Sequence, residues 1–118
     1  MIDSHCHLAD KQFTSDLDEV ILRAEENGIE AMICIADSLK EGERCLEIAE
    51  KYDQIFCTVG VHPHCAKDWK EGDTEELKQL KDASEKVVAI GEIGLDYHYD
   101  NSGFEKTLLE RLRKKSVQ

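Results

Sequence analysis

The chain has 118 residues, of which 41% are hydrophobic and 35% charged, and its formal net charge is −11. This size and balance are typical of one globular domain with a modest core. So acidic a chain lacks the broad basic surface with which proteins bind nucleic acid nonspecifically, but bound metal ions could still supply positive charge at one site.

The sequence contains no apolar run long enough to span a membrane and no secretory signal sequence. We therefore expect a chain without a membrane partner that resides in the cytoplasm, or in the nucleus if its source is eukaryotic. The cysteines are odd in number, show no Cys-x-x-Cys spacing and lie mostly in apolar runs, which favours buried free thiols over disulfides or a zinc knuckle. They are Cys6, Cys34, Cys45, Cys57 and Cys65.

The opening residues of the chain predict a strand that presents two histidines on one face. Side chains alternate along a strand, so His5 and His7 point to the same side, together with Asp3. Imidazole is the commonest nitrogen ligand for zinc and other first-row metals, and two rings that meet at one point form part of such a site. A His-x-His pair alone is common, so a metal site needs further ligands from elsewhere in the chain.

The next segments alternate between helix and strand. Ser15 with Asp18 resembles a capping box, apolar residues follow at helical spacing, and Gly28 is placed to end the helix. Residues 29–36 form an apolar run that is typical of a parallel strand buried on both faces. Residues 38–52 again show the apolar spacing of a helix.

The same order continues along the rest of the chain. Residues 55–61 and 87–93 predict the third and fourth strands. A helix capped near Asp73 or Thr74 lies between them, and residues 104–117 are typical of a basic amphipathic helix. Because strands and helices alternate without hairpin signals, we expect an α/β fold with a parallel sheet and right-handed crossovers.

Polar residues follow or end the predicted strands, at the carboxyl edge where parallel α/β sheets collect their chemistry. His62 and His64 flank Pro63 after the third strand, where they could contact substrate or metal or form a surface turn. Glu92 lies in the apolar run of the fourth strand, between glycines. A buried carboxylate needs a cation or a firm hydrogen-bonding partner, so Glu92 predicts either a metal ligand or a structural salt bridge.

Three segments resemble N-terminal signatures of the TatD family of metal-dependent deoxyribonucleases. They are Asp-Ser-His-Cys-His-Leu at residues 3–8, Val-Gly-Val-His-Pro-His at 59–64 and Ile-Gly-Glu-Ile-Gly-Leu-Asp-Tyr at 90–97. Their order and spacing match, and the resemblance runs from residue 1 to about residue 102. It implies a TIM-barrel hydrolase of the amidohydrolase type that cleaves phosphodiester bonds in DNA, typically from the 3′ end. It also implies a centre of two divalent ions, which could be magnesium, manganese or zinc.

The resemblance further implies roles for single residues. His5 and His7 correspond to ligands of one metal ion, and Glu92 to a carboxylate that bridges two, which makes Glu92 a candidate catalytic residue as well. His62 is similar to the family's histidine that lines the substrate site and is the second catalytic candidate. His64 and Asp96 are further candidates for binding the DNA substrate.

The chain departs from the family in its length. Family members are roughly twice as long, as a complete TIM barrel requires, and the second half of their barrel brings two further histidine ligands and an aspartate that handles the attacking water. Residues 1–118 are therefore expected to form a single incomplete barrel domain, an N-terminal half with four βα units, in which 103–118 is a divergent C-terminal helix. We expect such a chain to be inactive or weakly active alone and to self-associate through its open barrel edges.

Two alternative functions stay open. A non-catalytic half-barrel could keep a remnant metal site and act by binding or by chain association, in which case one weakly held ion is expected instead of two. A different substrate of the amidohydrolase type, such as an amide or an ester, is the other alternative, because one barrel fold hosts many chemistries.

Overall fold

The computed structural model describes residues 1–98, so the helix predicted at 104–117 and the divergent segment 103–118 lie outside the described residues. Within residues 1–98 the chain forms a parallel sheet whose strands lie in the order β1-β2-β3-β4. They are β1 (Ile2–Cys6), β2 (Ala31–Cys34), β3 (Ile55–Val59) and β4 (Val87–Ile90). The predicted parallel α/β order is confirmed, and strands that follow one another in sequence are also neighbours in space, as in a barrel.

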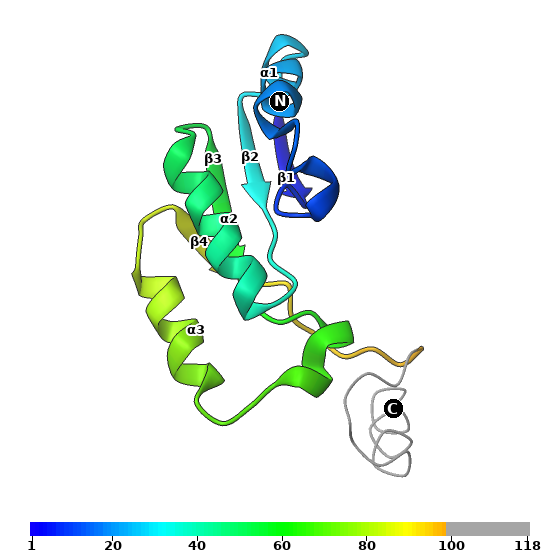
Figure 1. Ribbon diagram of the computed structural model, residues 1–118, viewed down its shortest axis with the longest axis vertical. Coiled ribbons are helices and arrows are strands. Elements are labelled where there is room, and N and C mark those ends of the chain that lie inside the picture. The colour runs from blue at the N-terminus through cyan, green and yellow to red at the C-terminus, as the bar shows by residue number, and fades with distance from the viewer. Residues whose placement is uncertain (99–118) are drawn as a thin grey trace.

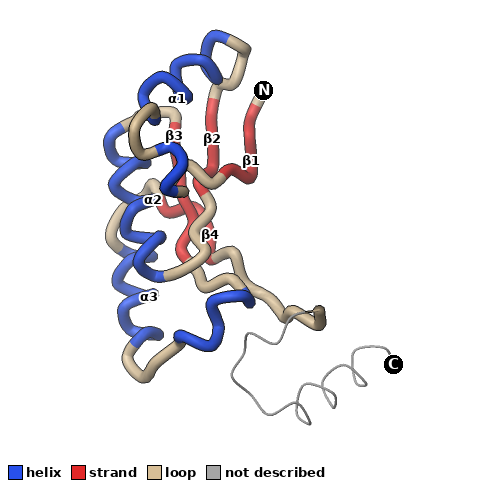
Figure 2. The backbone as a smooth tube through the Cα atoms, turned by 45° about the vertical axis from the view of Figure 1, so that its right-hand side comes forward, coloured by secondary structure: helices blue, strands red, loops and turns tan. Residues whose placement is uncertain are grey.

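Three α-helices follow the strands: α1 (Leu17–Glu26), α2 (Leu39–Lys51) and α3 (Asp73–Asp82). Figure 1 traces this alternation along the chain, and Figure 2 shows the helices on one side of the sheet. Two short 3-10 helices, η1 (Lys11–Phe13) and η2 (Pro63–Asp68), lie in the loops after β1 and β3. None of the helices in residues 1–98 has the length and apolar character needed to cross a membrane.

The end of α1 has the predicted glycine cap. Gly28 adopts a φ of +88°, which glycine tolerates best, and its N–H donates to the carbonyl of Glu25 at 2.9 Å. The N–H of Ile29 donates to the carbonyl of Ala24 at 3.0 Å, which completes a Schellman motif. Helix α1 therefore ends where the sequence predicts.

The start of α1 differs from the prediction. Its N-cap residue is Asp16 instead of Ser15, and the Asp16 side chain makes no capping hydrogen bond, so the predicted capping box of Ser15 and Asp18 is wrong. The N–H of Asp16 donates to the carbonyl of Phe13 at 3.3 Å. The turn that this hydrogen bond closes runs from Phe13, the last residue of η1, to Asp16. Ser15 lies inside the turn, so α1 begins after it, at Leu17.

The core lies between the helices and the sheet. Its largest fully buried side chains come from α2, β2 and β3, and they are Ile48, Ile55, Val59, Cys34, Cys45 and Cys57. Burial of each large aliphatic side chain contributes about 1.5–3 kcal/mol. All five cysteines are free, as predicted; three are buried, and Cys6 and Cys65 are half-buried.

Two strands differ from their predicted surroundings. In β2 only Met32 and Cys34 are buried, whereas Ala31 and Ile33 are half-buried, so burial on both faces is wrong for this strand. Within the described residues no second layer packs on the face of the sheet that lacks helices (Figure 2). Strand β4 ends at Ile90, so Glu92 lies in the loop beyond it, with 35% of its side chain exposed instead of buried in the strand.

Candidate metal centre

Main-chain hydrogen bonds join three loops at the carboxyl edge of the sheet. The N–H of His62 donates to the carbonyl of Asp37 at 2.9 Å, and the N–H of Glu92 donates to the carbonyl of Ala36 at 3.1 Å. The loops after β2, β3 and β4 are thus connected through backbone atoms. These bonds fix the positions of the three loops, and therefore of their side chains, relative to one another.

Gly60 permits the closest of these approaches. A Cβ atom on Gly60 would lie 2.6 Å from the carbonyl carbon of Gly91, a separation that no side chain can keep. The Thr58 hydroxyl donates to the carbonyl of Gly91 at 2.7 Å. The N–H of Gly91 donates to the carbonyl of Val59 at 2.9 Å. The glycine that allows a close approach to the Glu92 loop is therefore in the loop after β3, since a Cβ on Gly91 itself would meet nothing within 4 Å.

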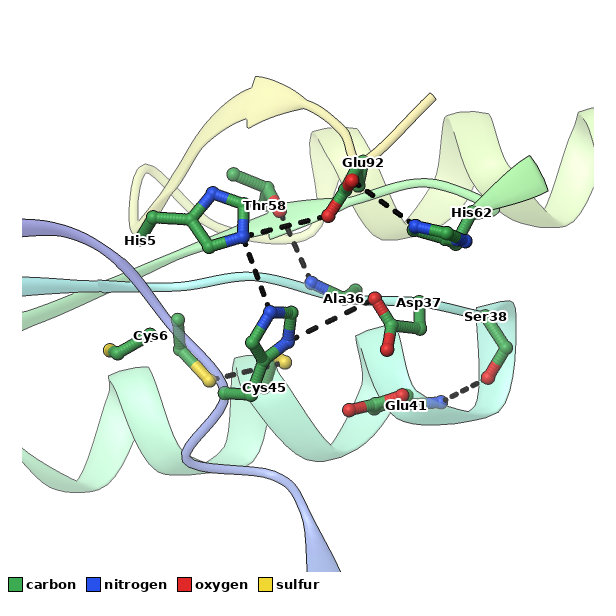
Figure 3. Close-up of polar contacts among 12 residues, drawn as sticks. His5, Cys6, Ala36, Asp37, Ser38, Glu41, Cys45, Thr58, His62 and Glu92 are labelled. Carbon is green, nitrogen blue, oxygen red and sulfur yellow. Dashed lines mark hydrogen bonds and ion pairs between the residues drawn. The ribbon is translucent and has the colours of Figure 1, made fainter. Parts of the chain in front are cut away.

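His5, His7 and Glu92 converge at this edge. Nε2 of His5 lies 3.2 Å from Nε2 of His7 and 3.5 Å from Oε2 of Glu92. One ligand atom from each of the three residues lies within 4.8 Å of the other two. Figure 3 shows the Glu92 carboxylate between the rings of His5 and His62.

Two of these separations, from His5 to His7 and from His5 to Glu92, are those of ligands that share one divalent cation, and the third lies within 4.8 Å. Metal–ligand bonds of about 2.0–2.2 Å place neighbouring ligand atoms about 3.0–3.5 Å apart in octahedral or tetrahedral coordination. Two imidazole nitrogens and a carboxylate oxygen form the donor set that zinc, manganese and iron accept. Three protein ligands also leave positions for water or substrate, which is the arrangement of catalytic rather than structural zinc sites.

His62 holds the Glu92 carboxylate in place. Nδ1 of His62 accepts a hydrogen bond from the N–H of His64 at 3.1 Å, so in the neutral ring the proton is on Nε2. That Nε2 lies 3.2 Å from Oε1 of Glu92 and can donate to it. One carboxylate oxygen of Glu92 therefore faces His62, and the other faces His5.

His64 and Asp96 pair with each other beside this centre. Nε2 of His64 lies 2.7 Å from Oδ2 of Asp96, and the N–H of His98 donates to Oδ1 of Asp96 at 2.7 Å. Both side chains line an open cleft of about 580 Å³ that also reaches His62 and Glu92. The structure thus brings all six predicted site residues to one edge of the sheet, where their roles as ligands or substrate contacts stay predictions.

Asp37 and Glu41 also lie at this edge, and the sequence patterns miss them. Nδ1 of His7 lies 3.9 Å from Oδ1 of Asp37, and ligand atoms of His7, Asp37 and Glu41 lie within 4.8 Å of one another. Burial, followed by the neighbouring Asp37 carboxylate, raises the pKa of Glu41. The position of Asp37 just beyond the second strand is the signal that could have identified it, because the other site residues also follow strands.

The family model for TatD related DNase matches residues 2–115 of the chain. The chain belongs to the TatD family. The uncharacterized metal-dependent hydrolase YabD of Bacillus subtilis is 43% identical over 102 residues, which cover 86% of this chain and 40% of YabD. The 3′-5′ ssDNA/RNA exonuclease TatD of Cronobacter turicensis is 39% identical over 98 residues, which cover 83% of this chain and 37% of that relative.

Solved structures of TatD proteins share the fold. The TatD family hydrolase from Entamoeba histolytica superposes with a TM-score of 0.81 at 33% identity, over 99% of this chain and 44% of that one. YJJV, a TatD homolog from Escherichia coli K12, gives a TM-score of 0.80 at 30% identity, over 99% and 45%. The predicted fold, half of a TIM-barrel hydrolase, is confirmed, and the chain spans less than half the length of these TatD relatives.

Proposed function

We propose that this chain is the metal-binding N-terminal part of a TatD hydrolase that cleaves phosphodiester bonds in nucleic acid, with DNA as the substrate. The observation that supports it is the convergence of His5, His7 and Glu92 on one point at the carboxyl edge of the sheet. The names of relatives such as the TatD exonuclease of Cronobacter turicensis favour nucleic acid over an amide or ester.

In this proposal His5, His7 and Glu92 would hold one divalent ion, with two imidazole nitrogens and a carboxylate oxygen as donors. A bound divalent ion polarises a phosphoryl oxygen and lowers the pKa of water. His62 donates from Nε2 to Oε1 of Glu92, which fixes the plane of the carboxylate before substrate arrives. We further propose that the Glu92 carboxylate would also serve a second ion in the complete site.

The substrate would lie in the cleft beside this centre. His64 and Asp96 line it, and we propose that this pair of side chains contacts the bound strand. The negative net charge of the chain favours a mode of binding in which metal ions, rather than a basic surface, neutralise the backbone of the nucleic acid. Residence in the cytoplasm stays a prediction from the sequence.

Metal binding tests the proposal. Calorimetric titration of the 118-residue chain with zinc or manganese should show a saturable site that is lost in His5→Ala and in Glu92→Gln. His98→Ala is the matched control, because it removes a histidine outside the proposed ligand set and should bind metal as the unaltered chain does. Equal binding by the unaltered chain and His5→Ala would contradict the proposed centre.

A further inference from the structure

His7 faces two different groups through its two ring nitrogens. Its Nε2 lies 3.2 Å from Nε2 of His5, in the proposed metal centre, whereas its Nδ1 lies 3.9 Å from Oδ1 of Asp37. Within the described residues both Nδ1 of His7 and Oδ1 of Asp37 are buried atoms without a hydrogen-bond partner. An unsatisfied buried donor or acceptor costs about 1–3 kcal/mol, so this facing pair needs a function or a partner.

A second cation between His7, Asp37 and Glu41 is one way to satisfy these atoms. It conflicts with the proposed centre, because a neutral imidazole has one nitrogen lone pair, and His7 would have to give up its remaining proton to bind ions on both sides. Asp37 and Glu41 also lie at the start of α2. The positive end of the helix dipole there stabilises carboxylates and disfavours a cation.

A hydrogen bond between the ring and the carboxylate is the better use of the same atoms. It requires the two heavy atoms to approach by about 1 Å, from 3.9 Å to the normal N–H···O distance. The position of Asp37 is well fixed for this contact: its carbonyl accepts from the N–H of His62, and the next residue, Ser38, is the N-cap of α2. Asp37 and His7 also line the same small pocket of about 170 Å³, together with His62 and Glu92.

We propose that Asp37 is a positioning residue for His7: its carboxylate accepts a hydrogen bond from Nδ1–H of His7 and thereby keeps the lone pair of Nε2 directed at His5 and Glu92. The inference rests on the proposed function in that Nε2 is taken to be a metal ligand. Carboxylates that hold ligating histidines in this way fix both the tautomer and the orientation of the ring. Glu41, in the first turn of α2, does not position His7 in this proposal.

The tautomer of His7 can be measured without any metal. Long-range ¹H–¹⁵N NMR spectra of the metal-free chain near pH 8, about 1.5 units above the usual pKa of histidine, should show a proton on Nδ1 of His7. Asp37→Ala should move the proton to Nε2, whereas Asp37→Asn, which keeps an accepting oxygen, should preserve the original tautomer. Glu41→Gln is the matched control and should leave the His7 signals in place, and backbone amide spectra report whether each variant is folded.

Zinc affinity provides the second measurement. Loss of such a supporting carboxylate typically weakens metal binding by about 10- to 100-fold, so Asp37→Ala should show this loss and Glu41→Gln should not. A His7 ring that keeps one tautomer in both Asp37→Ala and Asp37→Asn would overturn the inference, as would equal loss of a bound ion in Asp37→Ala and Glu41→Gln. If the unaltered chain has the Nδ1–H tautomer and Asp37→Ala loses it, but the unaltered chain itself binds no zinc, the proposed function fails while the hydrogen bond stands.

Discussion

Gly60 lies where β3 ends, against the main chain of Gly91. We expect Gly60→Ala to destabilise the chain by about 1–3 kcal/mol, because a Cβ would be 2.6 Å from a backbone carbon that cannot rotate away. The displaced Gly91 would take Glu92 with it, so metal binding should weaken as well. Urea denaturation and a zinc titration measure the two effects.

Gly42 provides the contrasting substitution. A Cβ on Gly42 would meet Val59 Cγ1 at 3.5 Å and Leu80 Cδ1 at 3.6 Å, which are ordinary van der Waals contacts. Because alanine is favoured over glycine in a helix by about 0.5–1 kcal/mol, Gly42→Ala in α2 should leave stability equal or higher. Similar destabilisation in both variants would show that the close approach at Gly60 has no special cost.

Two thiols whose pKa is raised, those of Cys6 and Cys57, should react slowly in the native chain. Burial raises the pKa of Cys6 to about 12 and that of Cys57 to about 11, so little thiolate exists at neutral pH. We expect a bulky thiol reagent to label these residues slowly in the folded chain and to find five thiols after denaturation. Because the pKa values are raised in the folded state, the unfolded chain ionises first, and stability should fall as the pH rises from about 9 through 12. Rapid labelling of native Cys57 at neutral pH would contradict this account.

At the scale of elements, Lys86 joins the start of β4 to the turn between α2 and β3. Its Nζ donates to the carbonyls of Tyr52, Asp53 and Ile55 at 3.2, 2.7 and 3.0 Å. We expect Lys86→Met to lose about 1.5–3 kcal/mol, the usual value of hydrogen bonds to a charged group. Thermal or urea denaturation measures this loss. Lys81→Met is the control: Lys81 pairs with Asp82 at the surface, where such changes stay within about 0.5 kcal/mol.

Helices and strands with a regular apolar pattern could be predicted from the sequence, and irregular segments could not. The end of α1 at Gly28 and the helix at residues 39–51 follow from local chemistry, because caps and apolar spacing act within a few residues. The 3-10 helix η2 was missed, since the segment after Pro63 shows no periodic apolar face. Strand β4 ends before Glu92, whose N–H donates to the carbonyl of Ala36 after β2, and no local pattern contains such a long-range contact.

The site shows the same division. The shared face of His5 and His7 follows from strand alternation alone, and their meeting with Glu92 follows from the rule that parallel strands present their carboxyl ends together. The contact of His7 with Asp37 depends on how β1 pairs with β2 and on how the chain leaves each strand. Register and loop path are set by the whole sheet, so a residue without its own motif goes unnoticed in the sequence.

At the scale of the molecule, β1 and β4 are the outer strands of the described sheet. Val88 and Ile90 of β4 keep 49% and 42% of their surface exposed. Unpaired strand edges with exposed apolar side chains promote association, so we expect the 118-residue chain to form dimers or larger species in analytical ultracentrifugation. The double variant Val88→Lys, Ile90→Lys should shift the distribution toward monomer. Leu22→Lys, which changes an exposed apolar residue on α1, should leave it unaltered.

Nuclease activity of the 118-residue chain should be low. The described residues place three candidate ligands around one point, and loss of further groups from a hydrolytic site commonly costs about a thousandfold or more in rate. Turnover of labelled single-stranded and duplex DNA with magnesium or manganese measures this, and His5→Ala controls for contaminating nucleases. A rate close to that of a full-length TatD relative, abolished in His5→Ala, would show that half of the barrel suffices.

The bonds that hold the loops of the site together run from the N–H of His62 to the carbonyl of Asp37 and from the N–H of Glu92 to that of Ala36. None of these atoms belongs to a side chain, so the bonds themselves do not depend on which side chains stand at positions 62 and 92. The backbone at this edge of the sheet therefore sets the shape of the site, whereas the side chains set its chemistry. Substitution of those side chains can change the preferred metal or substrate while the backbone hydrogen bonds between the loops persist. That separation makes this half-barrel a practical starting point for directed evolution of new metal-dependent reactions.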